Sequence, residues 1–489
     1  MSELLGANTD VLDRKAESLS VDARRVQDIR TLAQRALGEI EASWNGSDLR
    51  RLTQQWEQQM SPLLAGASAS LDTCAARLRA QSAAQRLTSS EDGNSPGTPM
   101  PTPMPLPASP PKRGSPAENA TWWKSLTARQ QQQVIREHPE WIGNRDGVDF
   151  TARDLANRAL LFVERTRLVA DGYRIEAEVA DDWSRGRITV DPGALDRVEN
   201  KLDSILAIQL TLAQDDPRQL LLLDLGRGRA QAAIANGNVQ TATNVAVFVP
   251  GMTTTVNKDM KGYDSQMSQL QRRSESESGR AHPTQPETTA TVTWIGYQAP
   301  QLLDTLNWGK SVLQIDLARQ GAAELAPFLQ GIGAARDHDA HLTLLGHSYG
   351  STTAGLALQQ NTGVDDVVFF GSPGIGTDHV EDLKLAPGHS FYIETQQDVV
   401  GDAAIFGTDP SQMIGMNYHP SARESTVVDP LSGEIRHFRE SAGHSEYLLS
   451  ESTSQYNMSV IVAGMPSRLA NDGCENLGAL NQPYVSVNP

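Results

Sequence analysis

Cysteine is nearly absent from this chain of 489 residues, whose only two cysteines are Cys74 and Cys474. They lie far apart and show no metal-ligand spacing, so the sequence supports neither a disulfide framework nor a zinc site. Aromatic residues are also scarce, at 5% of the chain. Alanine, arginine and glutamine are frequent instead, which predicts many helices.

Two further absences limit where the chain acts and what it binds. No apolar run is long enough to cross a bilayer, and the first residues lack the apolar core of a signal peptide. The net charge is −17 at pH 7 and no run of basic residues occurs, which excludes nucleic acid as a partner. We expect no transmembrane segment, and a protein that is either cytoplasmic or exported by a route other than the general secretory one.

Residues 1–88 show the apolar periodicity of two helices. The segment SWNGSD interrupts it, because Gly46 can end one helix and a serine or aspartate can cap the next. The pattern predicts an antiparallel helical hairpin, which buries too little alone and needs a helical partner or the rest of the chain. The first stripe repeats every seventh residue at Leu12, Leu19, Val26, Ala33 and Ile40, and the second contains Leu49, Leu52, Trp56, Met60, Leu63, Ala67, Leu71 and Leu78.

The rest of the chain divides into three regions. Prolines dominate residues 89–116, which predicts an extended linker. Residues 117–213 show helical spacing and form a helical lead-in. Residues 214–489 alternate apolar or β-branched runs with helical stretches, which predicts the α/β class, a mostly parallel sheet with helices on both faces. A hairpin is expected around Gly226 and Gly228, and later strands at 244–251, 290–297, 341–348, 365–374 and 390–398.

A serine between two glycines follows one of these apolar runs. The segment GHSYG, from Gly346 to Gly350, fits the G-x-S-x-G pattern, in which a strained turn between strand and helix exposes the serine hydroxyl. Ser348 would then be a nucleophile, and the N–H of Tyr349 would lie at a helix N-terminus, where it can stabilise an oxyanion. The plainer alternative is a structural glycine turn, because short motifs also occur by chance.

A serine hydroxyl needs a base, and the base needs an orienting carboxylate. In this type of sheet the chain order is serine, acid, histidine. Asp398 directly follows a predicted strand and is favoured as the acid, with Asp402 as its rival. We favour His444 as the base, because it stands between a flexible Ala-Gly pair and an expected helix. The other histidines that follow the acid are His419 and His437, and His437 resembles part of a strand.

The loop after residues 244–249 supplies another group that this chemistry needs. Gly251 lets the backbone approach a substrate, and the N–H of Met252 is the second candidate oxyanion donor. An ordinary Pro-Gly turn is the alternative. His347 is expected to line the substrate pocket together with Gly251, with a packing role as its alternative. Residues 257–289 are expected to be a polar insertion among the loops of that pocket.

Eight segments between Ala117 and the C-terminus match, in order, the motifs of one known family. They are WWKSLTARQQQQVIREHPEWIGNRDGV, RDLANRALL, NVAVFVPGMTTT, WIGYQAP, GHSYGSTTAGLAL, VVFFGSPG, FGTDPS and GHSEYL. This region therefore resembles the actinobacterial-type α/β-hydrolases long catalogued as a domain of unknown function. The resemblance implies the α/β-hydrolase fold with a helical lead-in and a triad of Ser348, Asp398 and His444. Before the acid, relatives often have a glycine where this chain has two glutamines.

Trp44-Asn45-Gly46 stands at the predicted turn between the two N-terminal helices. The hairpin thus resembles the Trp-X-Gly secretion substrates of type VII systems. The resemblance implies export by such a system and contact with its machinery. The Tyr-x-x-x-Asp/Glu signal expected just after the second helix is missing. Tyr447 to Glu451 fits that spacing but lies inside the hydrolase-like region, so we treat it as a chance match.

Together these residues predict a serine hydrolase that cleaves carboxylic esters, with lipid or other acyl esters as substrates, through an acyl-enzyme. The reaction needs no metal and no organic cofactor. Two alternatives stay open. A domain that has lost activity would serve as a secretion or interaction protein, and a peptidase or thioesterase would use the same triad.

Overall fold

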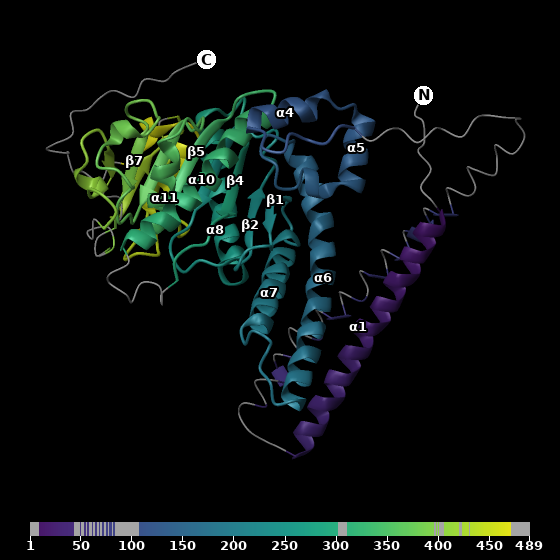
Figure 1. The fold of residues 1–489 in the computed structure, drawn as a ribbon. Coiled ribbons are helices and arrows are strands. Elements are labelled where there is room, and N and C mark those ends of the chain that lie inside the picture. The colour runs from purple at the N-terminus through teal and green to yellow at the C-terminus, as the bar shows by residue number, and fades with distance from the viewer. Residues whose placement is uncertain are drawn as a thin grey trace, which may run out of the picture. The chain divides into compact units, whose positions relative to one another are not determined.

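The computed structural model describes residues 9–43, scattered positions between 49 and 83, residues 107–301, and residues 311–470 apart from a few loop positions. The chain separates into two compact units, Met1–Pro105 and Leu106–Pro489 (Figure 1). The boundaries at 88, 116 and 213 stay predictions. The loop positions left out are 396, 397, 399, 401–404, 420–422 and 430, and both cysteines and Trp44 to Gly46 also lie outside the described residues.

The first unit contains α1 (Thr9–Ser43), the long helix that the seven-residue repeat predicts. Ala23, on the apolar side of this helix, is buried. Later residues bond to it in reverse order: Trp56 Nε1 donates to Gln34 Oε1 at 2.6 Å, and Ser68 Oγ donates to the Ala23 carbonyl at 3.0 Å. The described positions after α1 therefore run antiparallel to it.

The second unit is built on an eight-stranded sheet in the order β1-β2-β4-β3-β5-β6-β7-β8. β2 pairs antiparallel with both β1 and β4, whereas all pairs from β4 to β8 are parallel. The hairpin predicted around Gly226 and Gly228 is the β1–β2 pair. The strands are β1 (Arg218–Asp224), β2 (Gln231–Asn236), β3 (Asn244–Val249), β4 (Thr289–Ile295), β5 (His341–His347), β6 (Asp366–Phe370), β7 (Ser390–Ile393) and β8 (Asn417–His419).

Helices cover both faces of this sheet (Figure 1). One face carries α8 and α12, and the other carries α10 and α11. β2, β3 and β4 are buried along their whole length because side chains pack on both of their faces, as their continuous apolar runs predict. The helices of this unit are α4 (Pro116–Ser125), α5 (Ala128–Glu137), α6 (Phe150–Ser184), α7 (Ala194–Leu212), α8 (Val256–Ala281), α10 (Ser311–Ala335), α11 (Tyr349–Leu358) and α12 (Thr453–Val462).

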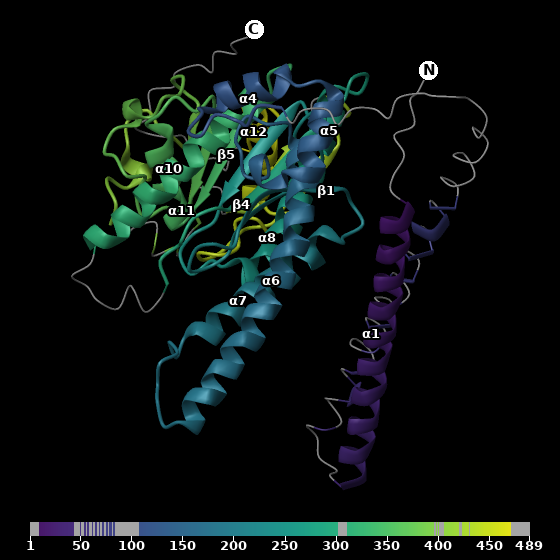
Figure 2. The ribbon, with the colours of Figure 1, turned by 45° about the vertical axis from the view of Figure 1, so that its right-hand side comes forward.

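The helical lead-in is anchored to the sheet at its edge strand, β1. On α6, Arg153 Nη2 donates to the Leu221 carbonyl at 2.7 Å, and Asn157 Nδ2 donates to the Leu220 carbonyl at 3.0 Å. These buried side chains satisfy carbonyls of the edge strand. Beyond this contact, α6 and α7 run side by side away from the sheet (Figure 2). In the described part of the chain no helix, including the 35-residue α6, is long and apolar enough to span a membrane.

Residues 257–289 are not the polar insertion that the sequence predicts. Most of them form α8, which connects β3 to β4 across one face of the sheet. Met267 and Leu270 dock this helix and are fully buried. Its buried Asp264 pairs with Arg218 of β1 at 3.0 Å. The prediction was wrong because a few apolar residues at helical spacing suffice to dock a helix whose buried polar groups find partners.

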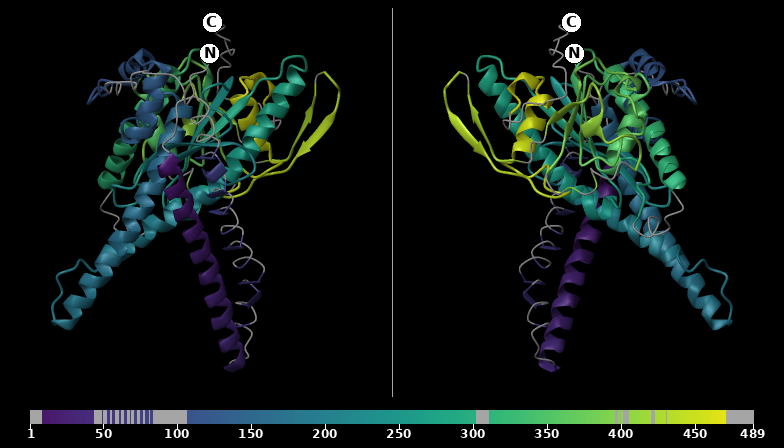
Figure 3. Two further views of the ribbon diagram at one scale, coloured as in Figure 1. Left: turned by 90° about the vertical axis from the view of Figure 1, so that its right-hand side faces the viewer. Right: turned by 90° about the vertical axis from the view of Figure 1, so that its left-hand side faces the viewer.

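A second, two-stranded sheet follows β8. Its strands are β9 (Ser425–Val428) and β10 (Ile435–Phe438), which pair antiparallel. Figure 3 shows this hairpin extending beside α8. Arg436 on β10 binds Glu277 of α8, with Nη2 and Oε2 2.8 Å apart, and Glu277 is fully buried. This ion pair attaches the hairpin to the helix that covers the main sheet.

Candidate active site

Ser348 lies in the turn between β5 and α11, at the edge of the sheet where the parallel strands end, called here the carboxyl edge. Its backbone has φ 55° and ψ −132°, and the residue is 4% exposed. A Cβ on Gly350 would overlap the Val249 carbonyl oxygen, and a Cβ on Gly346 would lie 2.9 Å from Ser351 Cα. The strained turn predicted from the glycines is present, and it holds the hydroxyl at the N-terminus of α11.

Asp398 and His444 form a hydrogen-bonded pair at the same edge. His444 Nδ1 lies 2.9 Å from both carboxylate oxygens of Asp398. Asp398 Oδ1 also accepts the N–H of Val400 at 3.0 Å. As predicted, Asp398 follows a strand, here β7. His444 lies in the loop between β10 and α12, and that helix begins only at Thr453. The structure thus brings together the acid and the histidine that the sequence favours.

Of the rival residues, only His437 can be compared in full, and it does not enter this arrangement. His437 is exposed on β10, where its Nδ1 lies 3.0 Å from Thr426 Oγ1. Asp402 and the side chain of His419 lie outside the described residues. Within the part of the chain that is described, no group of three His, Cys, Asp or Glu side chains is placed to hold a metal ion.

The serine and the Asp398–His444 pair meet at the end of β6. The Ser348 N–H donates to the Phe370 carbonyl at 3.0 Å. A Cβ on the next residue, Gly371, would lie 2.7 Å from Asp398 Oδ2 and 3.1 Å from His444 Nδ1. Because Nδ1 faces the carboxylate, Nε2 points to the other side of the ring. Both residues belong to the described part of the chain, and no hydrogen bond joins His444 Nε2 to Ser348 Oγ there. In enzymes without substrate, the bond between a nucleophile and its base is often long.

The electrostatics of this pair favour an ionised acid. Burial opposes the charge of Asp398, but the hydrogen bonds from His444 and Tyr447 outweigh burial and lower the pKa of Asp398 to about 2. The carboxylate is therefore charged at neutral pH, and it can only accept hydrogen bonds. The proton on the His444 imidazole consequently sits on Nδ1, which leaves Nε2 able to accept one.

The loop after β3 lies directly against Ser348. A Cβ on Gly251 would lie 2.7 Å from Ser348 Cβ and 3.0 Å from Ser348 Oγ, so this position accepts only a bare backbone. Met252 follows Gly251, and Tyr349 is the first residue of α11. The two predicted oxyanion donors, the backbone N–H groups of Met252 and Tyr349, therefore belong to the two segments that meet at the serine.

Two hydrogen bonds hold that loop in place, and sequence reasoning missed both. Tyr297 Oη donates to the Pro250 carbonyl at 2.7 Å, and the Thr253 N–H donates to the Pro300 carbonyl at 2.7 Å. Tyr297 is buried and its ring stacks on that of Tyr349, with 6.3 Å between centroids. The segment WIGYQAP, which contains Tyr297 and Pro300, was the available signal.

His347, for which the sequence left a pocket position and a packing role open, contacts the candidate base. Its Nε2 lies 2.9 Å from the His444 carbonyl oxygen, and its ring stacks on Phe370 with 5.0 Å between centroids. Burial, followed by the neighbouring His444, lowers the pKa of His347 to about 4. The ring is therefore neutral at pH 7, and its Nε2–H donates to the carbonyl. This contact is the packing role that the sequence left as an alternative.

Tyr447 is a site residue that sequence reasoning set aside as part of a chance motif. Its Oη donates to Asp398 Oδ2 at 2.6 Å and accepts the N–H of Thr395 at 3.0 Å. Thr395 Oγ1 also donates to the Gly443 carbonyl at 2.7 Å, which ties the end of β7 to the His444 loop. The segment GHSEYL, in which this tyrosine stands three residues after the histidine, was the signal that could have pointed to it.

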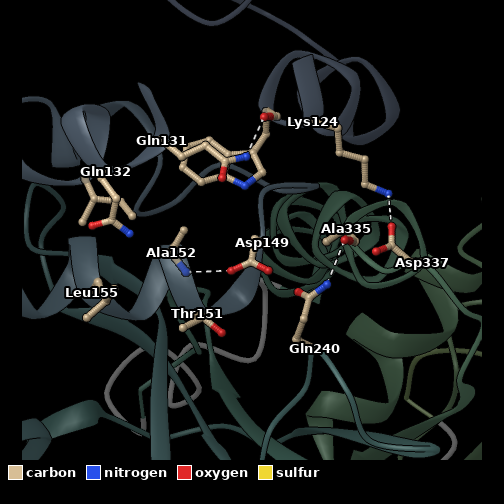
Figure 4. A pocket seen from close by; sticks show the side chains of 12 residues that line it. Lys124, Gln131, Gln132, Asp149, Thr151, Ala152, Leu155, Gln240, Ala335 and Asp337 are labelled. Carbon is tan, nitrogen blue, oxygen red and sulfur yellow. Dashed lines mark hydrogen bonds and ion pairs between the residues drawn. The ribbon is translucent and has the colours of Figure 1, made fainter. Parts of the chain in front are cut away.

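The pocket in Figure 4 lies at the opposite edge of the sheet and has a volume of about 310 Å³. Gln240 precedes β3 and Asp337 precedes β5, whereas Ser348 follows β5. Two contacts of its polar side chains join separate segments of the chain. Lys124 Nζ lies 3.0 Å from Asp337 Oδ1, and Gln240 Nε2 donates to the Ala335 carbonyl at 3.0 Å.

A second cavity, also of about 310 Å³, lies on the side of the sheet that carries Ser348. Phe406 connects it to the site, because its ring meets that of Tyr349 edge-on with 5.5 Å between centroids. The apolar side chains Ile315, Ile405 and Phe406 in its lining suit an apolar substrate group. The lining residues are Ile315, Gly376, Thr377, Asp378, Ile405, Phe406 and Gly407.

Comparisons with known proteins agree with this architecture. A family model described as alpha/beta hydrolase matches residues 226–408, which include Ser348 and Asp398. An uncharacterized protein of Mycobacterium bovis is 34% identical over 243 residues, which cover 48% of this chain and 88% of that protein. The chain belongs to the alpha/beta hydrolase family. An uncharacterized protein of Mycobacterium tuberculosis is 32% identical over 336 residues, which cover 66% of this alpha/beta hydrolase. The matched region spans only 47% of that longer protein.

Two hydrolases are among the solved structures to which the chain shows similarity. A cold-adapted esterase from an Arctic intertidal metagenomic library is 13% identical, with a TM-score of 0.28 and coverage of 52% of this chain and 93% of the esterase. A 2,6-dihydroxy-pseudo-oxynicotine hydrolase is 12% identical, with a TM-score of 0.31 and coverage of 74% and 92%. With the family match and the sheet order, the predicted alpha/beta hydrolase fold is confirmed.

Proposed function

We propose that this alpha/beta hydrolase is a serine hydrolase that cleaves carboxylic esters, with lipid or other acyl esters as its substrates. The observation that carries the proposal is the position of Ser348, strained and next to the Asp398–His444 pair at the end of β6. A hydroxyl at a helix N-terminus, an imidazole with one nitrogen available and a buried carboxylate are the groups that acyl transfer to serine requires.

In the proposed reaction, Ser348 Oγ attacks the ester carbonyl while His444 Nε2 takes its proton. The N–H groups of Met252 and Tyr349 stabilise the negative oxygen of the tetrahedral intermediate. His444 then gives the proton to the leaving alcohol, and an acyl-serine remains. Water deprotonated by the same imidazole cleaves the acyl-serine and regenerates the free hydroxyl. Asp398 stays ionised throughout and keeps the imidazole in the required tautomer.

We assign the acyl group to the cavity beside Phe406. Ile315, Ile405 and Phe406 give this cavity apolar walls, and Phe406 contacts the residue that follows the nucleophile. A volume of about 310 Å³ is at the small end for ligand sites. Short acyl esters should therefore be cleaved faster than long ones, and a series of p-nitrophenyl esters of increasing chain length measures this order.

Labelling with a fluorophosphonate, which reacts with activated serines, tests the nucleophile. The matched control is Ser459→Ala, because Ser459 is also buried but lies on α12, where its Oγ donates to the Tyr456 carbonyl at 2.6 Å. Wild type and Ser459→Ala should be labelled and should hydrolyse p-nitrophenyl butyrate. Ser348→Ala should lose the label and at least about 10⁴-fold in kcat.

The other outcomes separate the remaining functions. Labelling that persists in Ser348→Ala would place the reactive serine elsewhere in the chain. A wild type without label or turnover would favour an inactive interaction protein. A thioester and a peptide anilide, assayed beside the ester, distinguish a thioesterase or a peptidase from an esterase, because all three would use the same three side chains.

We also propose that residues 1–88 direct the protein to a type VII secretion system. The proposal rests on the Trp-X-Gly resemblance at Trp44-Asn45-Gly46 and on the length of α1, 35 residues. Expression in a host with an active system, followed by fractionation, tests it, with Trp44→Ala as the variant expected to stay inside. Intact wild-type protein found only in the cytosol of that host would contradict the proposal.

A further inference from the structure

We propose that Tyr447 is a positioning residue that fixes the Asp398 carboxylate against His444, an inference that rests on the proposed function. The N–H of Thr395 donates to Tyr447 Oη at 3.0 Å, and Oη lies 2.6 Å from Asp398 Oδ2. Because a backbone N–H can only donate, Oη accepts from Thr395 and its own proton is directed to the carboxylate. The end of β7 thus sets the direction of the bond that holds the acid.

The hydroxyl completes the set of donors around the acid. Val400 N–H binds Oδ1 at 3.0 Å, His444 Nδ1 lies 2.9 Å from each oxygen, and Tyr447 binds Oδ2. Asp398 is only 2% exposed, so these donors replace solvent. Without the hydroxyl, Oδ2 would keep only the imidazole as a partner. The carboxylate would then be free to turn about its Cβ–Cγ bond and would concentrate its charge on the imidazole.

The ring of Tyr447 is held independently of its hydroxyl. The residue is 1% exposed, and its ring lies 5.4 Å from the Phe370 ring and 5.9 Å from the His347 ring. Burial raises the pKa of Tyr447 and the bond to Asp398 raises it further, so the hydroxyl keeps its proton and remains a donor at neutral pH. Phenylalanine at this position would keep the packing and lose only the donor.

The experiment compares Tyr447→Phe with Tyr456→Phe in the full-length protein. Tyr456 is also 1% exposed, its Oη donates to the Arg468 carbonyl at 2.8 Å, and its ring stacks on Phe438 with 4.6 Å between centroids. The control therefore loses a comparable buried hydrogen bond at a place that does not touch Asp398. Two properties are measured: kcat and KM for p-nitrophenyl butyrate as a function of pH, and the low-field NMR signal of the proton between His444 Nδ1 and Asp398.

In Tyr447→Phe we expect kcat about tenfold lower with KM unchanged. The acid side of the pH profile should differ from that of wild type, because the Asp398 carboxylate loses the hydrogen bond by which Tyr447 helps to lower its pKa. The low-field signal should shift or broaden. Tyr456→Phe should match wild type in all three properties.

A Tyr447→Phe protein that keeps the wild-type pH profile and low-field signal would overturn the inference, even where both variants lose thermal stability. Thr395→Val gives a second check, because it removes the bond to Gly443 and keeps the backbone N–H. It should leave the signal unchanged, and a change as large as that of Tyr447→Phe would assign the effect to the loop instead. A wild type without esterase activity would reject the proposed function, while the NMR comparison would still decide the role of Tyr447.

Discussion

The sheet carries a histidine–aspartate arrangement at each of its two edges, and only one of them adjoins a strained serine. At the carboxyl edge, Asp398 binds one imidazole, that of His444. At the edge where the parallel strands begin, called here the amino edge, Asp366 lies close to two imidazoles. Its carboxylate lies 2.8 Å from His389 Nδ1 and 3.1 Å from His341 Nε2.

The two arrangements differ in what the carboxylate does to its partners. Burial opposes the charge of His341, but the neighbouring carboxylate of Asp366 outweighs burial and raises the pKa of His341, whose Nε2 also lies 3.1 Å from the Ile461 carbonyl oxygen. The hydrogen bond between His389 Nδ1 and Asp366 Oδ1 raises the pKa of His389. Asp366 therefore holds protons on two rings and links the first residues of β5 and β6 to the residue before β7. A histidine–aspartate pair alone does not indicate catalysis, and the strained hydroxyl beside it makes the difference.

The largest expected effect contrasts the two acids. Asp398→Asn should lower kcat by about 10⁴-fold with the fold intact, because an amide favours the wrong imidazole tautomer. Asp366→Asn should leave kcat within about twofold but lower the free energy of unfolding by about 3 kcal/mol, because it removes the buried charge that lies between two imidazoles. Ester kinetics measure kcat, and urea unfolding measures the free energy of unfolding. A comparable loss of activity in both variants would remove the distinction between the edges.

A second contrast uses two glycines with left-handed backbones. Gly371 has φ 53° and Gly363, which precedes β6, has φ 74°, so an alanine strains either backbone by about 1 kcal/mol. Only at Gly371 does the new methyl meet the site, 2.7 Å from Asp398 Oδ2, whereas Gly363 has open space within 4 Å. Gly371→Ala should lower kcat by about 10²-fold, because small displacements of catalytic groups are costly. Gly363→Ala should lose stability only, and an equal loss of activity there would contradict this account.

The sequence predicted those parts of the site that local chemistry determines. The turn at Ser348 follows from two glycines between an apolar run and a helix of small residues. Asp398 was found because it directly follows a strand, and His444 because a flexible pair precedes it. Each of these features lies within a few residues of the side chain concerned, so local pattern, added to the chain order serine, acid, histidine, was enough to favour these residues among the candidates.

Contacts between distant segments could not be predicted in this way. Tyr447 binds Asp398 across 49 positions of the chain, and Tyr297 binds the Pro250 carbonyl across 47. Neither residue type is restricted to such a role, since a buried tyrosine is usually part of a core. The orientation of His347 was missed for the same reason, because its partner is a backbone carbonyl that leaves no trace in the sequence.

The stability of the two edges should respond to pH with opposite signs. The raised pKa values of His341 and His389 mean that their stabilisation is complete below the ordinary value of 6.5 and is lost as the pH rises through the folded-state values. The pKa of His347 is lowered to about 4, so the unfolded state binds its proton first and stability falls from pH 6.5 towards 4. The free energy of unfolding, measured in urea across this pH range, should depend less on pH at the alkaline end in Asp366→Asn. It should depend less on pH at the acid end in His347→Phe. Unchanged slopes in these variants would contradict the assignment.

The smallest expected effect concerns the support of the candidate base by its neighbour. His347→Phe keeps the stacking on Phe370 but loses the Nε2–H that donates to the His444 carbonyl. We expect kcat to fall only about fivefold, the equivalent of one ordinary hydrogen bond, because Asp398 still orients the imidazole through Nδ1. His437→Phe, on the exposed β10, is the matched control and should have no effect. A loss of kcat beyond about 10²-fold in His347→Phe would mean that the bond to the His444 carbonyl, rather than the Asp398 carboxylate, fixes the imidazole. The contrast between the two edges could then no longer be explained by their carboxylates.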